Sequence, residues 1–143
     1  MNKVLAVLTI VLVLGISGAS FSQETGIVAK GEARLTGKTW VWVRALYKDG
    51  RTLTPKSPDQ FTLKFKPDGT FSATTDCNAL SGRFAATKDK ISFSEIAATR
   101  MFCEASQESD FTALLKSAES YAFTARGRLI LELKEGDGSA TFE

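Results

Sequence analysis

The stretch of sequence that decides the fold runs from residue 76 to residue 103. It opens with DCNALSG (residues 76–82) and closes with TRMFC (residues 99–103). It contains both cysteines of the chain and the densest cluster of turn-forming residues. We expect the short strands and the helix predicted on either side of this stretch to pack around it.

The N-terminus has the pattern of a secretory signal peptide. Lys3 is a short positive region, residues 4–16 are almost all apolar, and Ser20 and Ser22 occupy the small-x-small positions of a cleavage site. The alternative is an uncleaved membrane anchor, but the apolar run is shorter than the ~20 residues that span a bilayer. No cysteine lies near the cut for lipoprotein attachment. We therefore predict a signal peptide over residues 1–22 and a soluble mature protein, not membrane-spanning, exported to the periplasm or beyond.

Export determines how the two cysteines are interpreted. Outside the cytosol an even number of cysteines usually forms disulfides, and Cys77 and Cys103 allow one pairing. A redox pair usually has close Cys-x-x-Cys spacing, and a metal site needs more thiols or imidazoles, whereas the chain has no histidine. We predict a structural disulfide rather than two buried free thiols. Closing this loop stabilises the fold by about 3 kcal/mol in the chain-entropy model.

Composition is that of one ordinary globular domain. The 143 residues are 43% hydrophobic and 24% charged, with a formal net charge of +2. The basic residues are scattered among acidic ones. This argues against nucleic acid or an anionic membrane as a partner.

The first strand follows a segment without periodicity. Residues 23–37 mix glycine, lysine and glutamate and predict a loose lead-in that reaches the first strand near Leu35. Residues 38–47 are rich in aromatic and β-branched residues, which favour a strand. Trp40, Trp42 and Leu46 fall on one face of that strand. An Asp-Gly turn follows at residues 48–51, and two prolines make residues 52–59 a loop or broken edge strand.

The middle of the chain predicts two hairpins. Residues 61–66 alternate apolar and polar, turn at residues 67–70, and resume as a strand over residues 71–75. Residues 82–87 and 90–94 predict the second hairpin. Its expected core residues are Phe84, Ile91 and Phe93.

One helix is predicted after this meander. Ser106 is its expected N-cap, and Glu108 and Asp110 lie in its first turn, where they complement the helix dipole. Its apolar stripe is Phe111, Leu114, Leu115 and Ala118. A hairpin over residues 121–125 and 129–134 and a last strand over residues 139–142 complete the chain.

About eight short strands and one helix indicate a mainly β fold. Parallel strands need crossovers, for which one helix is too few. We predict a small antiparallel β-barrel-like domain over residues 35–143, preceded by a lead-in segment over residues 23–34. A β-sandwich is the alternative, since strand count does not separate the two.

The motifs resemble the META domain family, which includes the HslJ-type heat-inducible proteins of bacterial envelopes. The resemblance rests on Trp40-Val41-Trp42, on FKPDG (residues 65–69), on DCN with SGRF (residues 76–78 and 81–84) and on TRMFC (residues 99–103). It covers roughly residues 35–142. It implies a compact antiparallel β-barrel-like fold with one helix, and an envelope protein associated with stress and antibiotic tolerance rather than a known enzyme.

The motif residues have a structural and a functional interpretation. Asp76 and Asn78 can form Asx turns that end a strand, and Gly82 can take a positive φ that returns the chain to the sheet. The bridge then ties this turn to the segment before the helix. In the functional interpretation, the polar turn and Arg100 form a recognition surface. The candidate site residues, structural or contact-making, are Asp76, Asn78, Ser81, Gly82, Thr99, Arg100 and Met101.

No catalytic constellation is evident in the sequence. The usual base of a serine or cysteine triad is missing because there is no histidine. The Gly-Asp-Gly of residues 136–138 is not followed by the Lys-Ser/Thr of a phosphate-binding loop. We expect a non-enzymatic protein that uses no cofactor or metal and acts through a protein or envelope partner. The alternatives are a carrier of small hydrophobic ligands in a barrel cavity and a secreted enzyme inhibitor.

Overall fold

The computed structural model describes residues 31–143 and contains a nine-stranded antiparallel sheet. Residues 1–30, with the predicted signal peptide and most of the predicted lead-in, lie outside the described part. The strands are β1 (Thr39–Tyr47), β2 (Thr52–Leu53), β3 (Thr62–Phe65), β4 (Thr70–Thr74), β5 (Ala79–Ala86), β6 (Ile91–Ala98), β7 (Ala118–Phe123), β8 (Leu129–Leu133) and β9 (Gly138–Phe142). The main helix is α2 (Glu108–Ser117), and short 3-10 turns occur at Pro58–Gln60 and Lys134–Gly136.

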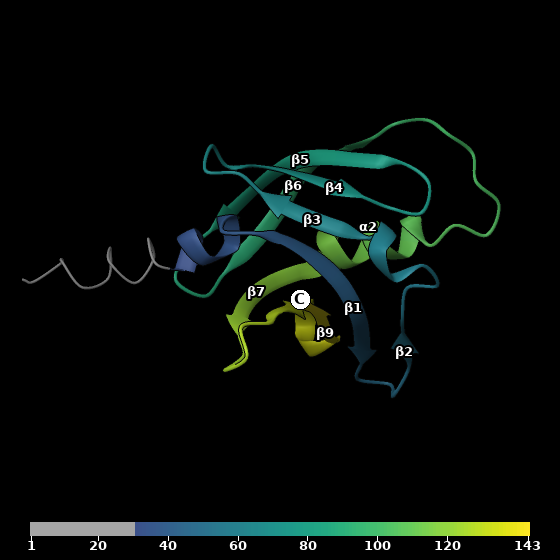
Figure 1. Ribbon diagram of the computed structural model, residues 1–143. Coiled ribbons are helices and arrows are strands. Elements are labelled where there is room, and N and C mark those ends of the chain that lie inside the picture. The colour runs from purple at the N-terminus through teal and green to yellow at the C-terminus, as the bar shows by residue number, and fades with distance from the viewer. Residues whose placement is uncertain (1–30) are drawn as a thin grey trace, which may run out of the picture.

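Strand β1 joins the two halves of the sheet. Its first residues pair with β3, and its later residues pair with β9 and with β2. The full order is β6-β5-β4-β3-β1-β9-β8-β7, with β2 beside β1. Figure 1 shows β1 curving from the β3–β6 half into the β7–β9 half, so that the sheet wraps round as a half-barrel. The prediction of a mainly antiparallel β fold with one main helix is confirmed.

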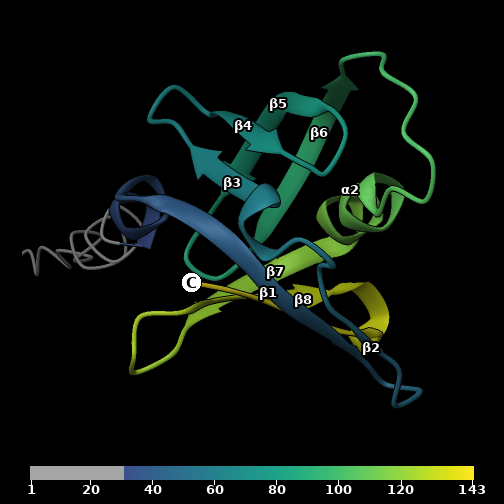
Figure 2. The same ribbon diagram turned by 45° about the vertical axis from the view of Figure 1, so that its right-hand side comes forward.

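The edge strands β6 and β7 meet at one end of the sheet. An isolated bridge joins Lys90 to Ser120, and Tyr121 donates its backbone N–H to Asp89 O at 2.8 Å. The Tyr121 hydroxyl donates to Thr87 O at 2.9 Å, and burial raises the pKa of this tyrosine above its ordinary value. Helix α2 lies beside β6 and β7 toward the other end (Figure 2).

Aromatic side chains fill the interior of the half-barrel. One cluster joins Trp42 and Phe61 to Phe111 of α2, with ring centroids 5.3 to 5.7 Å apart. A second cluster joins Phe65 to Phe84 at 4.8 Å, with the ring of Phe93 also in contact. Phe111, Leu114 and Leu115 of the predicted stripe are buried in α2, whereas Ala118, predicted to be its last member, is buried as the first residue of β7. The alternating residues Phe61, Leu63 and Phe65 are buried as well. Hydrophobic burial against the sheet therefore fixes the helix.

The structure corrects two predictions near the start of the domain. Residues 31–36 form a short helix that contains the buried Leu35, and the first strand begins only at Thr39. In β1 the register against β9 shifts between Trp42 and Arg44, which inserts one extra residue. Such a bulge reverses the alternation of faces. Ala45 is therefore buried, and Leu46, predicted to share a face with Trp40 and Trp42, is 40% exposed.

Candidate functional site

A cluster of side chains, called the clamp below, joins the turn at residues 75–78 to the segment 99–108. Its centre is Asn78, which is 7% exposed. Asn78 Oδ1 accepts hydrogen bonds from Thr99 Oγ1 and from Met101 N, each at 2.8 Å. Asn78 Nδ2 donates to Met101 O at 3.1 Å and to Glu108 Oε1 at 3.2 Å. The amide side chain of Asn78 thus bonds the backbone of Met101 as a neighbouring strand would, and it also bonds Glu108 of α2.

Glu108 holds the other side of the same turn. Its Oε2 accepts hydrogen bonds from Asn78 N at 2.8 Å and from Thr75 Oγ1 at 2.9 Å. Hydrogen bonds to a carboxylate are stronger than bonds between neutral groups. The first turn of α2 is therefore fastened to the end of β4.

Asp76 makes a second connection, to the residues just before α2. Its carboxylate accepts hydrogen bonds from Ser106 Oγ and from Gln107 N, the latter at 2.9 Å. A carboxylate at this place also suits the positive end of the helix dipole. The N-cap of α2 is Gln107, one residue later than predicted. The Ser106 hydroxyl instead accepts from Glu108 N at 3.0 Å.

The predicted disulfide is present beside these contacts. Cys77 and Cys103 are bonded, with their Cα atoms 5.8 Å apart. They are the two cysteines of the chain, so neither is a free thiol. The covalent bond and the clamp fix the same two segments.

Residues 99–105, called the stapled loop below, carry the two most exposed large apolar side chains of the described residues. The backbone is held at Met101 by Asn78 and at Cys103 by the disulfide. Between these two fixed points Phe102 is 94% exposed, and the Met101 side chain is 62% exposed. Arg100 is exposed as well.

The structure brings most of the predicted site residues together, but through contacts that differ from the predicted ones. Asp76 and Asn78 were predicted to bond their own backbone in Asx turns; they instead bond the segment 99–108. Ser81 is exposed on β5, opposite Ser72, and lies outside the clamp. The residues that meet at the clamp or the stapled loop are Asp76, Cys77, Asn78, Thr99, Arg100, Met101 and Cys103.

Gly82 was predicted to take a positive φ in a turn, which is wrong. It lies inside β5 at a register shift against β6, and its φ is not positive. A Cβ atom here would lie 2.7 Å from the Phe71 ring and 2.8 Å from Ser94 O. Glycine is needed because the ring and the neighbouring strand approach closely.

Sequence reasoning missed three partners of the clamp. The sequence predicts Thr75 as the end of a strand, and Glu108 only as a charge near the helix dipole. Gln107, which is 5% exposed, accepts from Lys56 N at 2.7 Å and donates to Thr54 O at 2.9 Å. The acidic residue at the helix start was the available signal, but its partner lies 30 positions earlier.

The arrangement is suited to holding a loop in one conformation. Asp76 and Glu108 already accept hydrogen bonds from within the domain. Within residues 31–143, no group of three or more His, Cys, Asp or Glu side chains is placed to hold a metal ion. Over the same residues, no helix is both long and apolar enough to cross a bilayer.

The fold and the clamp define a small antiparallel half-barrel with one packed helix and a disulfide-tied loop. The family model of the META domain matches residues 33–143, and the chain belongs to this family. No protein of curated function matches the sequence.

Two solved structures share the fold. The NMR structure of a protein from Burkholderia xenovorans is 24% identical, with a TM-score of 0.65, over 80% of this chain and 86% of that one. The crystal structure of a DUF4847 family protein from Bacteroides vulgatus is 23% identical, with a TM-score of 0.59, over 78% of this chain and 95% of that one. At these identities the similarity shows the fold alone.

Proposed function

We propose that this is a non-enzymatic, exported META-domain protein of the bacterial cell envelope that acts by binding another protein through the stapled loop. The observation that carries the proposal is Phe102, whose side chain is 94% exposed on a loop fixed on both sides. An aromatic side chain in water contributes nothing to the core of this domain. In a partner's pocket it would supply a large buried apolar area.

Rigidity is what makes this loop suited to recognition. Binding costs conformational entropy when a loop must be ordered, and a loop that is already fixed avoids much of that cost. Large aromatic side chains and arginine are also the residues that dominate binding energy at protein interfaces. The stapled loop presents Phe102 with Met101 and Arg100 beside it. A partner of complementary form has an apolar pocket with a carboxylate at its rim.

Export is supported by two observations. Residues 1–22 have the pattern of a signal peptide. The Cys77–Cys103 disulfide suits an oxidising compartment, since such bonds are rare in the cytosol. The family resemblance supports a physiological role in tolerance of stress or antibiotics.

Two other functions were weighed against this one. A secreted enzyme inhibitor would use the same rigid loop, inserted into an enzyme's cleft, and is a special case of the contact proposed here. A carrier of small hydrophobic ligands would need space inside the barrel. The interior aromatic rings pack against one another instead, which favours protein binding over the transport of a small ligand.

A site-specific crosslinking experiment tests the proposal. A photoreactive phenylalanine analogue replaces Phe102 in the full-length chain, which is produced in its own host so that the envelope partner is present. Leu46, an exposed apolar residue on β1, is the matched control position. We expect a discrete crosslinked protein from position 102 and none at that mass from position 46.

The crosslinked protein is then purified and its affinity measured. Phe102→Ala should weaken binding by about 30-fold or more, the loss typical of a hot-spot aromatic side chain. A deletion strain complemented with Phe102→Ala should be as sensitive to heat and antibiotics as the deletion itself. Equal crosslinking from both positions, or full complementation by Phe102→Ala, would show that this loop is not the contact.

A further inference from the structure

A groove separates the end of β6 from α2. It has a volume of about 420 Å³, and its walls include Leu80, Ile96 and Ala98 from the sheet and Thr112, Ala113 and Lys116 from the helix. Its location, on the side of the molecule where α2 lies next to β6, can be followed in Figure 2. The stapled loop begins directly after Ala98, but neither Met101 nor Phe102 lines the groove.

Strand β6 presents an open backbone edge to this side. Within residues 31–143, β6 pairs with β5 on one side. On its other side, backbone pairing with β7 is confined to the residues just before β6, at the Lys90–Ser120 bridge and the bond from Tyr121 N to Asp89 O. Thr99 N donates to Ala79 O at 3.1 Å, so position 99 faces β5. Bonding direction alternates along an antiparallel strand. The N–H and C=O of Ala98 therefore point away from β5, to a side on which no described strand pairs with β6 at this position.

The side chains of β6 lose their cover in the same direction. Ile91, beside the bridge to β7, is 2% exposed, Phe93 and Ile96 are partly buried, and Ala98 is exposed. This face of β6 is therefore buried at the start of the strand and exposed to solvent at its end. The uncovered part lies next to the unpaired edge, where one further strand would cover it.

The charges along the groove set the chemistry of its occupant. Glu108, at one end, already accepts hydrogen bonds from Asn78 and Thr75. Lys116, two helical turns later, is exposed and makes no ion pair within residues 31–143. The eight residue steps from Glu108 to Lys116 span about 12 Å of helix, the length of roughly four residues of extended chain.

We propose that this groove binds an extended segment of a partner protein, which adds to β6 as a further strand. Its backbone pairs with the free edge near Ala98, and its alternate apolar side chains cover Ile96, Ala98 and Ala113. An acidic side chain of the bound segment, about four residues from the position next to Glu108, pairs with Lys116. Main-chain hydrogen bonds with alternating side-chain pockets are the established physics of strand addition. This site uses residues different from those of the stapled loop, so it holds or fails independently of the function proposed above.

The test uses two synthetic peptides and protein expressed from the full-length chain and purified from the exported fraction. The peptides alternate valine and threonine over seven residues and carry aspartate at the N-terminal or the C-terminal end. We expect one of them to shift the amide NMR signals of β6 and α2 and to slow hydrogen exchange at Ala98. Lysine in place of the aspartate, or N-methylation of the backbone amides facing β6, should each weaken binding by about tenfold or more.

Matched protein variants locate the binding. Ala113→Arg places a long cation in the groove, and Ala125→Arg makes the same change at an exposed position in the β7–β8 turn. Both alanines are exposed, so both variants should fold, which their melting temperatures check. Ala113→Arg should abolish peptide binding and Ala125→Arg should leave it unchanged.

Several outcomes would overturn the proposal. Equal affinity of the N-methylated peptide would show that no strand is added. Binding unaffected by Ala113→Arg would place the peptide elsewhere. A dimer of the chain that Ala113→Arg dissociates would make the occupant a second copy, and no binding of either peptide would leave the groove without the proposed ligand.

Discussion

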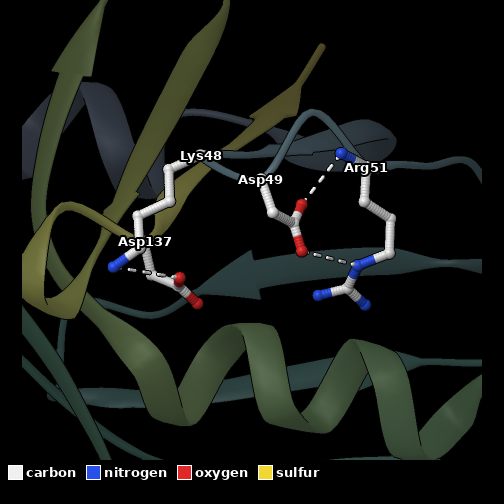
Figure 3. Close-up of polar contacts among 4 residues, drawn as sticks. All are labelled: Lys48, Asp49, Arg51 and Asp137. Atoms are coloured by element: carbon white, nitrogen blue, oxygen red, sulfur yellow. Dashed lines mark hydrogen bonds and ion pairs between the residues drawn. The ribbon is translucent and has the colours of Figure 1, made fainter.

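The β1–β2 turn and the turn at residues 75–78 both carry polar side chains, but they are built in different ways. The turn between β1 and β2 has ion pairs from Lys48 to Asp137 at 3.6 Å and from Arg51 to Asp49 at 3.5 Å (Figure 3). All four side chains are more than half exposed. The turn at residues 75–78 instead has Asn78, 7% exposed, bonded to residues 21 to 30 positions away.

The difference lies in what holds the backbone. The β1–β2 turn closes with its own backbone hydrogen bonds, Tyr47 N to Arg51 O and Gly50 N to Tyr47 O. Gly50 supplies the positive φ of 85° that the turn requires. The stapled loop belongs to no helix or strand. Its conformation therefore depends on the side chain of Asn78 and on the disulfide, whereas the charges of the β1–β2 turn lie on a backbone already fixed.

Removing the disulfide should give the largest effect. The double variant Cys77→Ala/Cys103→Ala should lower the free energy of unfolding by about 3 kcal/mol, because the unfolded chain regains the entropy of a 26-residue loop. Chemical denaturation followed by tryptophan fluorescence measures this. Trp42 reports the core because it is fully buried.

The same experiment has an internal control. The wild-type protein treated with a reductant should unfold at the denaturant concentration of the double variant, since both lack the bond. A double variant as stable as the oxidised protein would mean that the clamp alone fixes the loop, and that the disulfide is redundant for stability.

Breaking the clamp while keeping the disulfide should have the next largest effect. Asn78→Ala removes the partners of Met101 N, Met101 O and Thr99 Oγ1. We expect a loss of about 2 kcal/mol, because partly buried backbone groups are left without partners. Hydrogen exchange at Met101 should accelerate together with the loss of stability.

The matched control is Asp49→Ala in the β1–β2 turn. It also removes a side-chain oxygen that accepts a hydrogen bond from a backbone N–H, here that of Arg51. It should cost less than about 1 kcal/mol, because water replaces the lost partner. If both variants lost equal stability, burial and long-range contacts would not explain the difference between the turns.

The sequence was informative wherever the contacts are local or periodic. The hairpins, the apolar stripe of α2 and the Asp-Gly turn follow from alternation, helical spacing and turn chemistry, and all are present. The disulfide followed from counting cysteines in a chain predicted to be exported. These arguments need no knowledge of which distant residues meet.

The errors arise where distant contacts decide. One bulge in β1, set by its pairing with β9, turned Leu46 outward. Gly82 is required by the Phe71 ring on the neighbouring strand, which the motif itself does not reveal. Asn78 could be recognised as a turn residue, but its partners Met101 and Glu108 become neighbours only after the sheet has folded.

The smallest effect should come from the exposed ion pair of the β1–β2 turn. Asp137→Asn removes the pair with Lys48 but keeps the backbone bond from Lys48 N to Asp137 O at 2.9 Å. Since both side chains are more than half exposed, the loss should be below about 0.5 kcal/mol. Denaturation at about 0.02 M and 0.5 M salt measures it, and high salt should erase the difference from wild type because ions screen exposed charges. If the unfolding free energy instead fell by about 2 kcal/mol and the loss persisted in high salt, this turn would contribute as much as the clamp. The exposure of the side chains would then not explain the difference between the two turns.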